Sequence, residues 1–235
     1  MKLVVINGSP HKGNTYCLTQ QFLDEMKKHE EISVQEFFMP QDMPEFCRGC
    51  CSCVIKGEDF CPHKKYVRPI LDAMLDADAL IFTTPVYVMS ASGGMKNFLD
   101  HLPFLFLVHR PRPEMFHKKA MILSTAAGAG MKLSMKPIAD CIKYWGINRT
   151  YRLGFAIKAY NWDSVPEKRR RKYDRRIQKS AKKFWRSVSR GDSAPTLFCR
   201  SMFGFCRWMH RSGKDIPVDR KYWKEQGWLD GAKPY

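Results

Sequence analysis

Two groups of residues in this 235-residue chain have types and spacings that could do chemistry. The first is a loop of small and polar residues, Gly8-Ser9-Pro10-His11-Lys12-Gly13-Asn14-Thr15, directly after the apolar run 3–6. The second is a set of cysteines at positions 47, 50, 53 and 61. A strand that ends in a small-residue loop and then opens a helix can bind phosphate, because free backbone N–H groups and the positive end of the helix dipole meet there.

The spacing within the first loop excludes two better-known phosphate loops. Gly8 and Gly13 match the first half of the nucleoside-triphosphate loop, but Asn14 stands where that loop has Lys. The dinucleotide motif G-x-G-x-x-G is absent, since position 10 is Pro. The loop therefore favours a single terminal phosphate, and an ordinary strand-to-helix turn capped by Thr15 is the alternative.

The cysteines allow three interpretations. Cys47, Cys50, Cys53 and Cys61 lie within fifteen residues, and two-residue gaps let a chain bend around one [4Fe-4S] cluster. A zinc ion could use the same four thiolates, or three of them with His63. Reduced thiols without a metal are the third possibility. Cys51 fits neither metal scheme, and we expect it to face away.

The elements that position these residues follow from hydrophobic periodicity. We expect strands at 2–7, 32–38, 77–83, 119–125 and 150–157, and helices at 15–29, 66–75, 95–107 and 137–145. This alternation predicts an α/β fold, a three-layer sandwich with a five-stranded parallel sheet. Residues 39–62, which carry the cysteines, show no periodicity and are expected to form an inserted functional loop.

The last third of the chain has a different composition. Residues 166–190 carry twelve Lys and Arg against two acids, yet Tyr173, Ile177, Ala181, Phe184 and Val188 recur at helical spacing. We expect a closing helix with a solvated basic face and no nucleic-acid partner. A break at 191–195 precedes the aromatic-rich segment 196–211 and a tail predicted to be irregular. The predicted division is a domain at 1–190 and an extension at 191–235 that packs on the body or on a dimer partner, with membrane-surface contact less favoured.

Charge and hydropathy limit the partners and the location. The net charge of +17 favours anionic partners without naming one. No stretch reaches the roughly 18 apolar residues of a membrane span. The chain starts directly in a strand without a signal-peptide pattern, so a cytoplasmic protein is expected.

Three of the expected loops, beginning at Gly8, Thr84 and Thr125, would meet at the carboxyl edge of a parallel sheet, where open α/β sheets bind their ligands. The small residues Ala126-Ala127-Gly128-Ala129-Gly130 would let a flat ring approach the backbone closely. The sequence thus places a ring site beside a phosphate site.

These residues resemble the NADPH-dependent FMN reductase-like family of the flavodoxin superfamily. The resemblance spans roughly residues 1–160 and rests on Gly8–Thr15, on Thr84-Pro85-Val86-Tyr87 and on Ser92-Gly93-Gly94-Met95-Lys96-Asn97-Phe98-Leu99-Asp100. It implies a flavodoxin-like fold, FMN as cofactor, NAD(P)H as co-substrate, and a homodimer or dimer of dimers in which subunits complete each other's flavin sites. It also implies roles for single residues: Ser9, Asn14 and Thr15 hold the phosphate with help from His11, Pro85, Val86 and Tyr87 line the isoalloxazine, and Thr125 and Gly128 close the third side.

The cysteine spacing is similar to that of iron-sulfur flavoproteins, a subgroup of the same family, which implies a cluster that exchanges electrons with a ferredoxin-like partner. We therefore expect an FMN-dependent oxidoreductase. It would take electrons from NAD(P)H or a reduced redox protein and pass them to a quinone, flavin or nitro compound, or through the cluster. A non-enzymatic electron carrier and a redox- or metal-sensing protein are the alternatives. No protein side chain is expected to act as a catalytic group.

Overall fold

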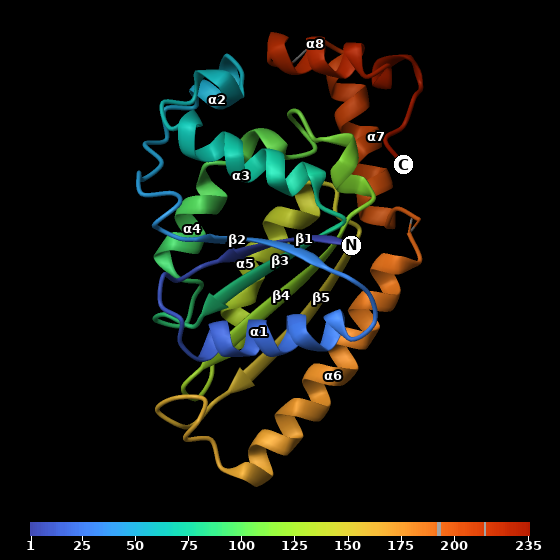
Figure 1. Ribbon diagram of the computed structural model, residues 1–235. Helices are drawn as coiled ribbons and strands as arrows, with labels where there is room; N and C mark the ends of the chain where they lie inside the picture. Colours follow the sequence, from blue (N-terminus) through green and yellow to red (C-terminus); the bar gives the residue numbers. More distant parts are fainter. Residues whose placement is uncertain (192–193, 214) are drawn as a thin grey trace.

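The computed structural model describes residues 1–191, 194–213 and 215–235. These residues form a five-stranded sheet in the order β2-β1-β3-β4-β5, and every neighbouring pair of strands is parallel. The strands are β1 (Lys2–Asn7), β2 (Ser33–Phe38), β3 (Ala79–Pro85), β4 (Lys119–Ala126) and β5 (Arg149–Ala156). Helices cover both faces of the sheet (Figure 1), so the predicted three-layer α/β sandwich is confirmed.

Different helices cover the two faces. One face is packed by α1 (Asn14–Lys27) and α6 (Glu167–Ser189), and the other by α3 (Lys64–Asp76), α4 (Gly93–Asp100) and α5 (Met131–Tyr144). Side chains of β1 alternate between them: Leu3 and Val5 join the core under α1 and α6, while Val4 and Ile6 join the other core. Burial on both faces explains why these parallel strands read as continuous apolar runs.

Helix α6 docks as its periodicity predicts. Tyr173, Ile177, Ala181, Phe184 and Val188 are its buried residues. They pack against the core shared by β1, β4, β5 and α1. The basic face is therefore left toward solvent along most of the helix.

Several predicted boundaries differ from the structure. The helix predicted at 95–107 ends at Asp100, and a 3-10 turn follows at Pro103–Leu105, because Pro103 cannot donate the next helical hydrogen bond. The helix predicted from Pro137 already begins at Met131, after Gly130 with its positive φ of 100°. The cysteine loop contains two short turns, α2 (Ser52–Ile55) and a 3-10 turn at Glu58–Phe60.

The extension is more regular than predicted. It contains α7 (Leu197–Arg211), α8 (Pro217–Glu225) and a 3-10 turn at Trp228–Asp230. Phe203, Trp223 and Trp228 pack there against Leu107 and Phe116 of the body. Of the predicted break at 191–195, residues 192 and 193 lie outside the described part of the chain, and the division at residue 190 stays a prediction. None of the described helices is long and apolar enough to cross a membrane.

A buried cation fastens the extension to the cysteine loop. The Arg110 guanidinium is 3% exposed and pairs with Asp219 of α8, which is 1% exposed. The same guanidinium donates to Glu58 Oε2 at 3.1 Å and to the carbonyl of Cys53. His109 Nδ1 lies 2.8 Å from the second oxygen of Asp219. One arginine thus joins two segments that are more than a hundred residues apart in sequence.

We expect Asp219→Ala to lower the free energy of unfolding by about 3–5 kcal/mol, because it removes the more deeply buried of the two carboxylates, Asp219 and Glu58, that pair with the Arg110 guanidinium. Chemical denaturation at neutral pH measures the change. Glu225→Ala is the matched control, since this exposed carboxylate of α8 pairs with the exposed Lys221 and its loss should cost less than about 1 kcal/mol. Equal losses in the two variants would contradict the role given to Arg110.

Candidate functional site

A pocket of about 280 Å³ opens at the carboxyl edge of the sheet. It is lined by Ser9, His11, Gly13, Asn14, Thr15, Pro85, Val86, Tyr87, Thr125, Ala126, Ala127, Ile157, Ala159 and Tyr160. All residues predicted to surround a flavin therefore line one pocket, except Gly128. The segment 157–160 adds a wall that the sequence did not predict, since it carries no motif and follows directly on the last strand.

Gly8 holds the first loop against β3 and α4. Its amide donates to the carbonyl of Thr83 at 2.7 Å, and Ser92 Oγ donates to the carbonyl of Gly8. A Cβ at position 8 would lie 2.7 Å from that Thr83 oxygen and 2.8 Å from Ser92 Oγ. Only glycine allows this approach without a shift of the neighbouring backbone.

Hydrogen bonds also join the loops to one another. Thr15 Oγ1 lies 2.6 Å from Thr125 Oγ1, which connects the first loop to the third. The amide of Val86 donates to the carbonyl of Thr125 at 2.9 Å, which connects the second to the third. Ser9 Oγ and the Tyr87 hydroxyl are 3.5 Å apart. The three loops therefore form one connected wall.

The beginning of α1 is suited to an anion. Its N-cap residue Gly13 has no side chain to cap the helix, so the first backbone N–H groups remain available to a ligand. No carboxylate belongs to the described lining of the pocket. Asn14 Oδ1 is buried without a hydrogen-bond partner among the described residues. The pocket thus fits a ligand that carries a terminal anion for the helix N-terminus and a hydroxyl group that can donate to Asn14 Oδ1.

The turn after Val86 forms an exposed apolar tip beside the pocket. Tyr87 and Ser90 pair across it, and the two residues between them, Val88 and Met89, both have positive φ, 47° and 61°. Val88 is fully exposed and Met89 is half exposed. A β-branched residue is strained in this left-handed region.

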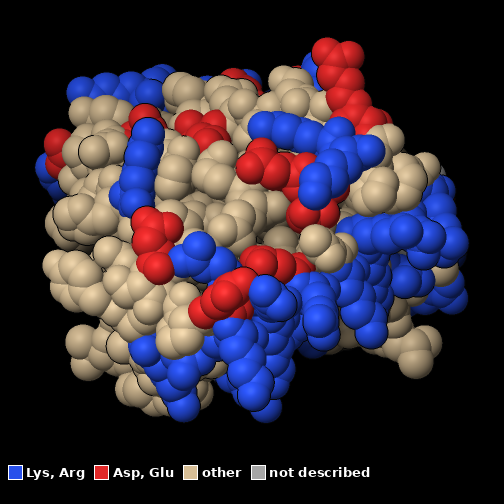
Figure 2. Space-filling model, turned by 60° about the horizontal axis from the view of Figure 1, so that its bottom comes forward, with Lys and Arg blue, Asp and Glu red and all other residues tan. Residues whose placement is uncertain are grey.

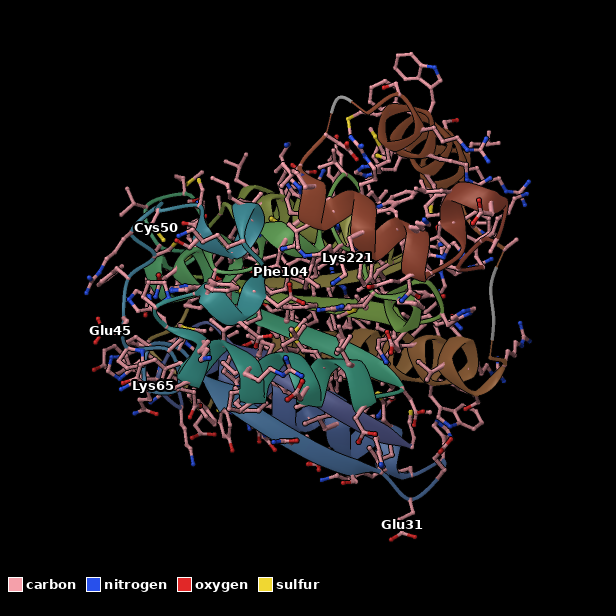
Figure 3. The ribbon with its side chains drawn as sticks, turned by 90° about the horizontal axis from the view of Figure 1, so that it is seen from above. Glu31, Glu45, Cys50, Lys65, Phe104 and Lys221 are labelled. Atoms are coloured by element: carbon pink, nitrogen blue, oxygen red, sulfur yellow. The ribbon has the colours of Figure 1, made fainter. Side chains whose placement is uncertain are left out.

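The cysteines gather around a second, smaller cavity of about 90 Å³. Cys47, Cys50, Cys53 and Cys61 all line it, together with His63 and His101, and all are free thiols. Cys51 lines the cavity too, so the expectation that it faces away is not supported. Seen from above, Cys50 lies near the margin of the molecule, whereas Phe104 lies in its interior (Figure 3). Cys53 and Cys61 are the buried members.

The thiols are close enough to influence one another. Burial raises the pKa of Cys53 to about 11, and neighbouring Cys61, Cys47 and Cys50 add to the rise. Burial also raises the pKa of Cys61. Four thiolates at this place therefore need a cation. As the side chains lie, no group of three or more in the described residues is placed to hold a single metal ion.

A chain of two imidazoles ends at the same cavity. The carbonyl of Asn97 can only accept, so His101 Nδ1 donates to it at 2.8 Å, and burial lowers the pKa of His101. His101 Nε2 then accepts from His63 Nδ1 at 2.9 Å. His63 Nε2 is buried and has no partner among the described residues. In neutral His63 this nitrogen carries a free lone pair, as a metal ligand would.

Helix α4 holds both candidate sites. Its N-cap residue Ser92 binds Gly8, which precedes the pocket residue Ser9 in the first loop. Five residues later, Asn97 Oδ1 accepts from the amide of Cys47 at 3.0 Å, and its Nδ2 donates to the carbonyl of Glu45 at 2.9 Å. The sequence pointed to Asn97 only within a family motif, because a single polar residue on a helix has no pattern that reveals a contact 50 residues away.

Comparison with known proteins decides the family. The sequence profile described as NADPH-dependent FMN reductase matches residues 1–154. The chain belongs to this family. Membership confirms the predicted resemblance, and with it the enzyme class: these are FMN-dependent oxidoreductases that use NAD(P)H.

Curated relatives carry a more specific name. An iron-sulfur flavoprotein of Archaeoglobus fulgidus is 36% identical over 104 residues, which cover 43% of this chain and 48% of that protein. One from Clostridioides difficile is 26% identical over 204 residues, 84% of both chains. The chain thus spans about half the length of the first relative and most of the second.

Solved structures share the fold. The apo form of the NADH:FMN oxidoreductase EMOB superposes with a TM-score of 0.55 at 19% identity, covering 77% of this chain and 89% of the other. An azoreductase from Bacillus anthracis gives a TM-score of 0.57 at 15% identity, covering 81% and 99%. These similarities confirm the flavodoxin-like fold.

We expect Asn14→Asp to weaken FMN binding about tenfold or more, because it adds a negative charge at the start of α1 beside the expected phosphate. The helix should tolerate the change, since acids are favourable in a first turn. Flavin fluorescence titration of the flavin-free protein measures both affinities. Riboflavin, which lacks the phosphate, is the control ligand and should bind almost unchanged. Equal weakening of both ligands would contradict the placement of the phosphate.

Proposed function

We propose that this family member oxidises NAD(P)H with FMN and passes electrons onward through a [4Fe-4S] cluster on its cysteine loop. One observation carries the proposal: helix α4 binds Gly8 of the first loop with its N-cap residue Ser92 and the four-thiol loop with Asn97. The relatives that are named iron-sulfur flavoproteins support the same function.

The pocket supplies binding and orientation for the flavin. The free amides at the start of α1, with the Ser9 and Thr15 hydroxyls, would hold the phosphate. Pro85, Tyr87 and Thr125 would flank the ring. Bound FMN supplies hydride and single-electron chemistry. The chain itself provides no carboxylate in the described lining, so the phosphate meets no opposing negative charge there.

The cysteine cavity has the donor set of a cluster. Cys47, Cys50, Cys53 and Cys61 would be the ligands, and the positive charge of a cluster's iron would stabilise thiolates whose pKa burial raises. The assignment to a cluster and not to a single ion is supported by the two-residue gaps between Cys47, Cys50 and Cys53. Zinc bound by three cysteines and His63 is the alternative, favoured by the free Nε2 of His63.

The exposed tip at Val88 and Met89 supports pairing of two subunits beside the flavin pocket. The homodimer, the ferredoxin-like partner, the small-molecule acceptor and the cytoplasmic location all remain predictions. The exposed position of Cys50 offers an electron exit from the cluster to a docked protein or small acceptor.

Iron and acid-labile sulfide assays on anaerobically purified protein test the cluster. We expect about four of each per chain. Cys53→Ser should lose most of the iron, while Cys51→Ser, a change in a thiol of the same cavity, should keep it. A protein with stoichiometric zinc would favour the alternative site. Colourless, metal-free protein with all thiols reactive would contradict both.

Stopped-flow mixing of the FMN-loaded protein with NADH or NADPH separates an enzyme from an electron carrier. We expect the flavin absorbance near 450 nm to bleach within seconds, since the family uses NAD(P)H. Heat-denatured protein with the same total FMN is the control for reaction of free flavin. A flavin that stays oxidised with both nucleotides, but is reduced by a redox protein, would indicate the carrier.

A further inference from the structure

A third concave site, separate from the flavin pocket and the cysteine cavity, lies at the opposite edge of the sheet from the flavin pocket. It is a groove of about 670 Å³ between α6 and the start of β5. The basic residues of its described lining are Lys119, Arg149, Lys179, Lys182, Lys183, Arg186 and Arg190, and that lining contains no carboxylate. Figure 2 shows Lys and Arg gathered densely on one side of the molecule, with few acidic side chains among them. The groove therefore concentrates positive charge in a concave surface.

Helix α6 contributes most of this charge from one face. Lys179, Lys182, Lys183 and Arg186 follow one another at spacings of three, one and three residues, opposite the buried stripe. Like charges at such helical spacings repel one another. None of the four forms an ion pair within the described residues, although Glu167 of the same helix pairs with Arg171. A bound anion would offset this repulsion among the four cations.

The groove is distinct from the flavin site. Arg149 begins β5 in the groove, and Ile157, just beyond the end of the strand, lines the flavin pocket. Eight strand residues at about 3.3 Å each separate the two by about 25 Å. A nicotinamide or flavin bound at one site therefore does not reach the other.

We infer that this groove binds a small anion with several adjacent phosphates. One phosphate carries about −1.5 to −2 charges near neutral pH, so a single phosphate would offset only about two of the four cations that α6 contributes, Lys179, Lys182, Lys183 and Arg186. The ring of Tyr151 is already covered by Lys183 Nζ at 5.6 Å and by the edge of Phe184 at 5.5 Å. Tyr151 is the aromatic residue of the described lining, and these contacts occupy its ring, so recognition there rests on the phosphates. The volume is that of a small-molecule site.

This inference goes beyond the redox function and does not depend on it. Isothermal titration calorimetry of the full chain with inorganic tripolyphosphate, at an ionic strength of about 0.15 M, tests it. We expect saturable binding of one tripolyphosphate per chain, and binding of orthophosphate at least about tenfold weaker. The bound FMN content should stay the same throughout, because the two sites are separate.

A matched pair of variants locates the site. Lys182→Glu/Arg186→Glu should weaken tripolyphosphate binding about tenfold or more, because it reverses two charges inside the groove. Lys168→Glu/Lys172→Glu makes the same charge change on exposed residues of the same helix outside the groove and should weaken it less than about threefold. Similar losses in both variants would mean a general charge effect and overturn the inference. So would the absence of saturation, or a DNA duplex that binds more tightly than tripolyphosphate.

Discussion

The contact between Gly8 and β3 is the constraint on which the flavin pocket depends. It extends the pairing of β1 and β3 by one residue past the end of β1, at a place where a Cβ would collide with the carbonyl of Thr83. The first loop is thereby fixed to the base of the second. The bond between Thr15 and Thr125 then fixes the third. The register of the sheet and these hydrogen bonds therefore set the distance between the walls of the pocket.

The cysteine loop is held in another way. It belongs to no sheet, and it buries Met43, Cys53 and Cys61 in the core under α3, α4 and α5. Its position also depends on polar contacts from outside, with Asn97 on one side and Arg110 on the other. Because the side chains of Asn97 and Arg110 are both buried, breaking either contact costs free energy. The C-terminal extension matters to this loop since Asp219 supplies the anion that Arg110 requires.

The sequence predicted the features that have a pattern. Strands buried on both faces gave apolar runs, and the rule that parallel strands share one carboxyl edge predicted that Ser9, Tyr87 and Thr125 lie close together. Patternless features could not be predicted. The pair formed by Arg110 and Asp219 spans 109 residues, and two isolated charges carry no periodic signal. The early end of α4 depends on Pro103. The apolar residues on both sides of this proline favoured a longer helix, so the predicted helix continued past it.

Helix α4 has eight residues, which makes it about 12 Å long with a turn of about 100° per residue. Ser92 at its beginning contacts Gly8 of the first loop, and Asn97 near its end contacts Cys47 of the cysteine loop. Adding or removing one residue would rotate one attachment point away from its loop while the other stayed in place. The helix therefore behaves as a spacer of fixed length and phase, in which exposed side chains such as Lys96 are free to change while the number of residues is not.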